Sequence, residues 1–140
     1  APNFKNLEPL LHTIFTSSEE NLSKYIIQTQ QYIIDLLGIR TRFILSSELE
    51  KNNLLKGQEK VIEICKTLGA TVYINSIGGQ DLYSFEDFKN SGIILKFLRP
   101  IHTAYKQFTN ENLPWLSIID VIMFNEVEHI GRMLDRFDLV

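Results

Sequence analysis

Small polar and cationic side chains follow three segments that we predict to be β-strands, at residues 41–45, 71–75 and 93–98. In an open parallel sheet, ligands bind outside the carboxyl ends of the strands, which meet at one edge. The sequence therefore predicts a ligand-binding edge formed by Ser46, Ser47, Asn75, Ser76 and Arg99. The alternative is that these residues are polar only because loops are polar.

Two adjacent glycines lengthen the loop after the second predicted strand. Gly78 and Gly79 permit positive φ angles and a close backbone approach, so their N–H groups could face a phosphate or a carboxylate. Neither a Walker loop nor the three-glycine dinucleotide fingerprint is present, and a plain tight turn explains the pair equally well. Tyr83, just beyond the glycines, is a further candidate ligand contact.

A carboxylate interrupts the apolar stretch from Trp115 to Phe124. Asp120 lies there with Ser117 three residues before it, so both side chains share one side of a predicted helix. A carboxylate on such a helix lies on a thin solvent stripe or is buried with partners. We expect Asp120 and Ser117 to be catalytic groups that meet the glycine loop, with Asp120 as a general base. A structural hydrogen bond from Asp120 to a loop backbone is the alternative.

Other chemistry is not indicated. The three histidines show no ligand spacing with one another or with Cys65, which argues against a zinc site. A nucleophile-elbow motif is absent as well. Cys65 lies on the apolar stripe of its helix, so we predict a buried core thiol.

The clearest predicted helix covers residues 17–37. Ser17 and Glu20 have capping-box spacing, apolar residues follow at helical intervals, and Gly38 is placed to end the helix. A helix, a glycine and a strand recur in residues 58–75 and again in 85–98. Pro114 opens a final helical stretch, which Asn125 and Glu126 break or kink before residues 127–134.

This order predicts the fold class α/β: a small parallel sheet with helices on both faces, in a Rossmann-like three-layer arrangement that could be part of a larger sheet. We expect right-handed crossovers to make all three strands parallel. The apolar helix after Pro114 is expected to pack against the sheet. Residues 1–140 are predicted to form a single domain, because about 150 residues is the usual size and no linker divides the chain.

Composition points to a folded protein of a reducing compartment. The chain has 44% hydrophobic residues, a net charge of −3 and one cysteine. Neither half is a polycation, so nucleic acid is not an expected partner, and no apolar run is long enough to suggest a membrane span. We expect a cytoplasmic protein. Composition identifies no cofactor and leaves a homo-oligomer open.

Several segments together resemble the carboxyl-terminal portion of the WbqC-like protein family. They are residues 38–47, 64–70, 73–79 with Tyr83, and 116–120 with Phe124 and Asn125; Phe88, Gly92, Ile93 and Phe97 fit between them in order. The resemblance spans about residues 1–130, and its most specific parts are Leu-Ser-Ile-Ile-Asp and the double glycine.

The resemblance implies a role in bacterial O-antigen and surface-polysaccharide biosynthesis, with transfer of an acyl or aminoacyl group to a nucleotide-linked sugar as the implied reaction. Members of the family begin with a His-Gln-Pro motif followed by Pro-Trp, which this sequence lacks. We therefore expect the chain to be the carboxyl-terminal part of a longer protein and to hold only part of the functional unit.

Two hypotheses follow. The first is an enzyme of the transferase class that modifies an activated sugar in a cleft lined by the strand-end residues, the glycine loop and Asp120. The second is a non-catalytic α/β module that binds a nucleotide-sugar or a partner protein. Both take a nucleotide-sugar or another activated small molecule as the expected ligand.

Overall fold

The computed structural model describes residues 1–109 and 111–140, which form two compact units. The helical unit combines residues 1–41 with 102–136, and the sheet unit combines residues 42–101 with 137–140. Each unit therefore joins segments that are distant in the sequence, and the single domain over residues 1–140 stays a prediction. The units are described separately below.

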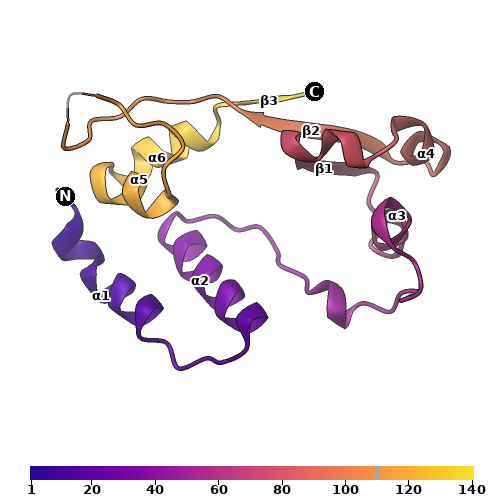
Figure 1. The fold of residues 1–140 in the computed structure, drawn as a ribbon, viewed down its shortest axis with the longest axis horizontal. Helices are drawn as coiled ribbons and strands as arrows, with labels where there is room; N and C mark the ends of the chain where they lie inside the picture. The colour runs from indigo at the N-terminus through magenta and orange to yellow at the C-terminus, as the bar shows by residue number, and fades with distance from the viewer. Residues whose placement is uncertain (110) are drawn as a thin grey trace. The chain divides into compact units, whose positions relative to one another are not determined.

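The sheet unit contains three strands in the order β1-β2-β3 (Figure 1). β1 (Val72–Ser76) pairs in parallel with β2 (Ile94–Pro100), and Tyr73 lies opposite Leu95. β3 (Phe137–Leu139) pairs antiparallel with the other side of β2. The predicted α/β class and the two parallel strands are confirmed, whereas the all-parallel sheet is wrong because β3 runs in the opposite direction.

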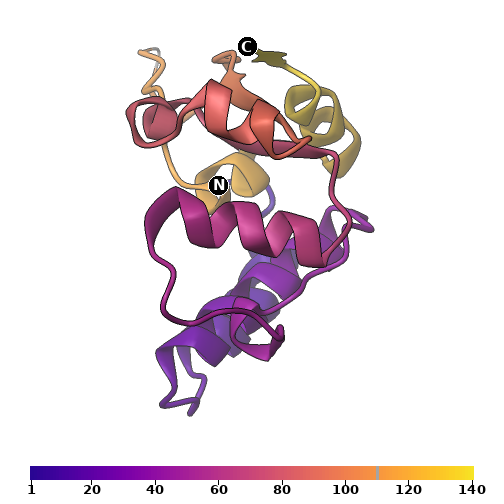
Figure 2. The same ribbon diagram turned by 90° about the vertical axis from the view of Figure 1, so that its right-hand side faces the viewer.

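One face of this sheet carries the core of the unit. Phe97 and Leu95 of β2 pack with Phe88 of α4 (Phe85–Asn90) and Cys65 of α3 (Gly57–Thr67). Both ribbon views show α3 below the strands (Figures 1 and 2). Cys65 is buried as predicted, and burial raises the pKa of its thiol.

The other face of the sheet is apolar and open. Val72, Ile74 and Ile94 alternate with the core-facing residues and are 42%, 47% and 57% exposed. Within the sheet unit the helices α3 and α4 cover one face, so the Rossmann-like three-layer arrangement is not confirmed.

Residues 41–45 do not form the predicted strand. They run without ladder hydrogen bonds between α2 (Leu22–Leu36) and the short 3₁₀ turn η1 (Ser46–Glu48), and the chain passes from one unit to the other at Thr41. Phe43 and Ile44 have high strand propensity but are 47% and 39% exposed. Propensity alone does not make a strand, because strand stability comes from packing and pairing with neighbours.

The helical unit contains α1 (Phe4–Phe15), α2, α5 (Ile118–Phe124) and α6 (Val127–Leu134). α1 and α2 run in opposite directions (Figure 1). Leu7 and Leu11 of α1 pack with Ile122 of α5 and Ile130 of α6 in one buried cluster. The apolar helix that was expected to pack on the sheet thus has its buried residue, Ile122, in a helix-on-helix core.

Capping residues set the ends of these helices. α2 begins after Asn21, whose side chain accepts a hydrogen bond from the Lys24 N–H, so the predicted capping box at Ser17 is wrong. Gly38 has a φ of 67°, as predicted for a residue that ends a helix. None of the helices in the described part of the chain is long and apolar enough to cross a membrane.

Asn3 joins the first helix to the end of α5. Its Nδ2 donates to the carbonyl oxygens of Ile122 (3.1 Å) and Asn125 (3.0 Å). Its backbone N–H donates to the carbonyl oxygen of Met123 (3.1 Å). The last carbonyls of a helix have no partners within it, so a seven-residue helix gains much from these bonds. Asn3 stands at the start of α1 but makes no side-chain cap there.

We expect Asn3→Asp to destabilise the helical unit by about 1–3 kcal/mol, because the substitution replaces two donors by a carboxylate facing carbonyl oxygens. The measurement is urea unfolding followed by circular dichroism. Asn6→Asp, with the same charge change on the same helix, is the control. Equal midpoints for the two variants would contradict the role assigned to Asn3.

Candidate functional site

The predicted strand-end residues after β1 lie close to one another in the sheet unit. Asn75 and Ser76 are the last two residues of β1, and the Asn75 Oδ1 accepts a hydrogen bond from the Ser76 N–H (2.8 Å). Asn75 is half-buried and Ser76 is exposed. The structure thus places an amide side chain at the carboxyl end of β1, as predicted.

The double glycine lies in a 3₁₀ helix, η2 (Ile77–Leu82), that follows β1 directly. Neither Gly78 nor Gly79 has a positive φ, so that part of the prediction is wrong. At Gly79 the absence of a side chain has a different consequence. A Cβ at this position would lie 2.6 Å from the Asn75 Nδ2, whereas a Cβ at Gly78 would meet nothing within 4 Å. Gly79 therefore makes room for the Asn75 amide.

Tyr83 is mainly a packing residue of the sheet unit. Its ring lies edge-on to Phe88 with 5.8 Å between centroids, and its hydroxyl accepts a hydrogen bond from the Tyr73 hydroxyl (3.5 Å). Burial and this hydrogen bond raise the pKa of Tyr73. Tyr83 still approaches the Gly79 position, at 3.6 Å, so it borders the same corner as Asn75.

Ser46 and Ser47 do not have the placement that the strand-end rule gave them. They begin η1 and are exposed, and the segment before them is not a strand. Arg99 is the second-last residue of β2, one position beyond Leu98, which pairs with Ser76 of β1, so it lies at the carboxyl end of the parallel pair as predicted. Asp138 of β3 lies opposite it on the other side of β2.

Asp120 is held by an aromatic partner in the helical unit. Its Oδ2 accepts a hydrogen bond of 2.6 Å from the hydroxyl of Tyr105, which comes from the irregular segment before α5. Both residues are partly buried. The carboxylate on this apolar helix is therefore paired, and its partner is a group that can itself donate and accept protons.

Ser117 is the N-cap of α5. Its Oγ accepts from the Ile119 N–H (3.2 Å), and its carbonyl oxygen accepts from the Asp120 N–H (2.9 Å). Ser117 and Asp120 thus lie together as predicted, with the serine fixing the first turn of the helix that carries the carboxylate. They belong to the helical unit, whereas the residues around the glycine loop belong to the sheet unit.

The environment of Tyr105 keeps its hydroxyl protonated. Burial raises the pKa of the phenol, the hydrogen bond to Asp120 and the negative charge of that carboxylate raise it further, and Gln107 lowers it. The phenol thus donates its proton to Asp120, and the side-chain hydrogen bond from Gln107, which lowers the pKa, meets its oxygen as an acceptor.

Tyr105 borders a hollow of about 470 Å³ whose lining comes entirely from the helical unit. We call it the polar hollow. Phe124 supplies an aromatic side chain to its lining, which also carries three basic and two acidic side chains: Lys106, His129, Arg132, Glu126 and Glu128. An Arg132 Nη2 lies 3.4 Å from the His129 Nδ1. Basic groups around an aromatic side chain suit a ligand that combines phosphate with a ring.

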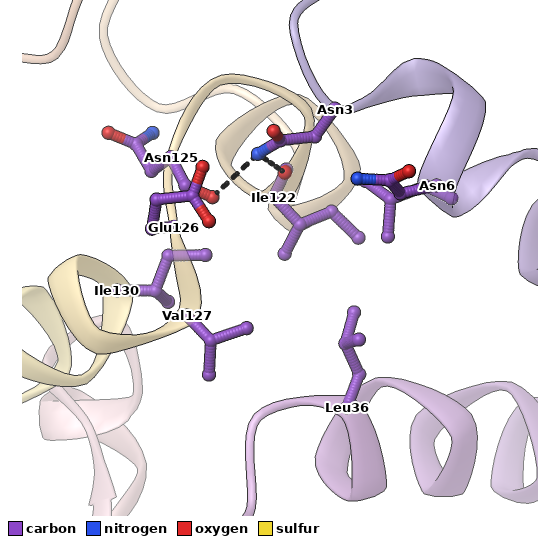
Figure 3. Close-up of a pocket in the computed structure, with 9 residues that line it drawn as sticks. Asn3, Asn6, Leu36, Ile122, Asn125, Glu126, Val127 and Ile130 are labelled. Atoms are coloured by element: carbon purple, nitrogen blue, oxygen red, sulfur yellow. Dashed lines mark hydrogen bonds between the residues drawn. The ribbon is translucent and has the colours of Figure 1, made fainter.

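A second hollow, of about 170 Å³, lies between α1, α2, α5 and α6 and is called the apolar hollow here. Its apolar lining is Leu7, Leu36, Ile122, Val127 and Ile130. Figure 3 shows the polar ends of Asn3, Asn6 and Glu126 above this apolar lining. Asn125 and Glu126 line both hollows, so the turn between α5 and α6 separates them.

The sequence analysis missed Tyr105, Lys106, His129 and Arg132. His129 and Arg132 are three residues apart on a predicted helix, which placed them on one face, but nothing in the pattern connected that face to residues 104–106. Among the described residues, no group of three or more His, Cys, Asp or Glu side chains could hold a metal ion.

Comparisons with known proteins give one match. The model of the WbqC-like protein family matches residues 1–131 of the 140-residue chain, which includes every residue of the helical unit that is discussed above except Arg132. No curated protein and no solved structure matches the chain.

We expect Gly79→Ala to displace the Asn75 side chain, because the added Cβ would overlap its Nδ2. In an amide NMR spectrum the Asn75 side-chain resonances should move and the Ser76 amide should lose its hydrogen-bonded shift. Gly78→Ala, which meets open space, should leave both unchanged and change stability by no more than about 1 kcal/mol. Identical spectra for Gly79→Ala and Gly78→Ala would refute the close contact between position 79 and the Asn75 side chain.

The pKa of Tyr105 should fall in Asp120→Asn, because the substitution removes the carboxylate charge and its acceptor. The difference in phenolate absorbance between wild type and Tyr105→Phe isolates this titration. Since the folded pKa is raised, the contribution of Tyr105 to stability is complete below an ordinary tyrosine pKa of about 10 and is lost as the pH rises through the folded value. An unchanged pKa in Asp120→Asn would show that the hydrogen bond does not form.

Proposed function

The chain belongs to the WbqC-like protein family, and we propose that it acts in bacterial O-antigen and surface-polysaccharide biosynthesis, transferring an acyl or aminoacyl group to a nucleotide-linked sugar. Family membership supports the pathway. The observation that supports a reaction is the Tyr105–Asp120 hydrogen bond of 2.6 Å at the edge of the polar hollow.

In the proposed reaction the acceptor is an amino group of the sugar. Its nitrogen attacks the carbonyl carbon of an acyl ester or thioester donor, a C–N bond forms, and the bond from that carbon to the leaving oxygen or sulfur breaks. The amine passes its surplus proton to the Tyr105 oxygen while Tyr105 passes its own proton to Asp120. The proton then returns along the same pair to the leaving group.

The arrangement of the pair suits this relay. Because Tyr105 already donates to Asp120, its oxygen can meet a substrate amine only as an acceptor. Ser117 acts as a positioning residue, since its side chain caps the helix that carries Asp120. General-base catalysis of this kind contributes about 10²–10⁴-fold to rate.

The polar hollow carries two permanently basic side chains that can bind phosphate, beside two carboxylates in the same lining. Arg132 and Lys106 provide donors for phosphate oxygens, and Phe124 offers an apolar surface to a base or a sugar ring. The predicted ligand contacts of the sheet unit stay predictions: Asn75, Ser76, Gly78, Gly79, Tyr83, Ser46, Ser47 and Arg99.

The test is turnover of a nucleotide-diphosphate amino sugar, UDP-glucosamine, with an acyl thioester, detected by mass spectrometry. Tyr105→Phe and Asp120→Asn should each lower kcat by about 100-fold or more and leave KM within a fewfold. Tyr32→Phe and Asp35→Asn, on α2, are the matched controls. If Tyr105→Phe turns over at the wild-type rate, the proton relay through Tyr105 is wrong.

Calorimetry of UDP-glucosamine binding, compared with turnover, distinguishes the transferase hypothesis from the hypothesis of a non-catalytic binding module. Lys106→Met and Arg132→Met should each weaken UDP-glucosamine binding about tenfold, as expected for the loss of one charge-assisted hydrogen bond. Binding by wild type with no turnover for any acyl donor class would favour the non-catalytic nucleotide-sugar module instead.

A further inference from the structure

The apolar hollow has the features of a separate small-molecule site, and the proposed reaction does not use it. Three of its lining residues, Leu7, Ile122 and Ile130, are at most 7% exposed and form the floor. Leu36 and Val127 form walls that are open to solvent in part, and Val127 is 38% exposed. A ligand in this space would bury apolar surface that the protein alone leaves accessible.

The rim of the hollow is polar and carries one negative charge. Glu126 precedes α6, and Figure 3 shows its carboxylate on the same side as the Asn3 and Asn6 amides. The Asn3 amide nitrogen is engaged by the carbonyl oxygens of Ile122 and Asn125, and Figure 3 shows the Asn6 amide with its nitrogen toward Asn3. The Glu126 carboxylate is therefore the charged acceptor of the rim, and a carboxylate above an apolar floor matches an ammonium group, which has three donors.

Size limits the ligand. The hollow holds about 170 Å³, close to an engineered cavity of about 150 Å³ that binds benzene. A ligand with about six non-hydrogen atoms therefore fills it. A nucleotide-sugar is much too large, so this hollow cannot be a second copy of the polar one.

We propose that the apolar hollow binds a compact primary amine whose branched aliphatic body rests on Leu7, Ile122 and Ile130 and whose ammonium group pairs with Glu126. The ammonium donates to the Glu126 carboxylate and to an acceptor of the neighbouring amides. The body displaces water from the Val127 and Leu36 walls. This inference is independent of the acyl-transfer proposal, because neither Tyr105 nor Asp120 takes part.

The experiment is an NMR titration of the isoleucine and valine methyl groups with three probes of the same shape: 3-methylbutylamine, 3-methyl-1-butanol and 3-methylbutanoate. The amine should shift the Ile122 and Val127 methyl resonances and bind about tenfold more tightly than the alcohol, with the carboxylate weakest. Removing one methylene from the amine should weaken binding about fourfold. Equal affinity for the three probes, or no shift with the amine, would overturn the proposal.

Single substitutions test the two parts of the site separately: Glu126 for the ammonium group and Val127 for the aliphatic body. Glu126→Gln should abolish the preference for the amine over the alcohol, whereas Glu8→Gln, with the same charge change on an exposed part of α1, should keep it. Val127→Phe should fill the hollow and abolish binding of all three probes. Unchanged binding in Glu126→Gln, or in a folded Val127→Phe, would show that the probes bind elsewhere. Because Glu126 also lines the polar hollow, the two proposals are separated by Tyr105→Phe instead: Tyr105 does not line the apolar hollow, so this variant should leave amine binding unchanged.

Discussion

The helical unit depends on the way Asn3 holds the end of α5. Three hydrogen bonds from this one residue reach the backbone of residues 122–125, more than a hundred positions along the chain. They satisfy carbonyls that a seven-residue helix cannot satisfy itself. They also fix the turn of Asn125 and Glu126, which lines both hollows. The shape of both candidate ligand sites therefore follows from a contact between the two distant ends of the unit.

The second constraint is the hydrogen bond between Tyr105 and Asp120. It attaches the irregular segment that carries Tyr105 to the short helix α5. Lys106 of that segment thus lines the same hollow as His129 and Arg132 of α6. A buried or half-buried carboxylate on an apolar helix is costly unless a partner satisfies it. Here the partner is a phenol that keeps its proton, which gives one bond both a structural and a chemical role. The two roles can be separated by experiment, because Tyr105→Phe removes the hydroxyl group that donates to Asp120 and keeps the aromatic ring.

Local signals in the sequence predict local structure well and long-range structure poorly. The helices around Cys65 and Phe88, the parallel pairing of residues 72–76 with 94–98, and the glycines at positions 38, 69 and 92 follow from periodicity and turn chemistry. β3 has three residues, too few for a period, and α1 is missed although Leu7, Leu11 and Ile14 have helical spacing. The sequence leaves two environments open for Asp120, a solvent stripe or burial with partners, and the structure shows a partner. Its partner could not be named, because Tyr105 lies in a segment without regular structure.

The proposed function requires the nucleotide-sugar to bind in the helical unit, at the polar hollow beside Tyr105 and Asp120. Chemical-shift mapping of the backbone amides with UDP-glucosamine, on uniformly labelled protein, locates the bound ligand. We predict that the largest shifts lie in residues 104–106 and 124–132. Shifts confined to residues 75–79 and Tyr83, at the end of β1, would place the ligand on the sheet unit and contradict it.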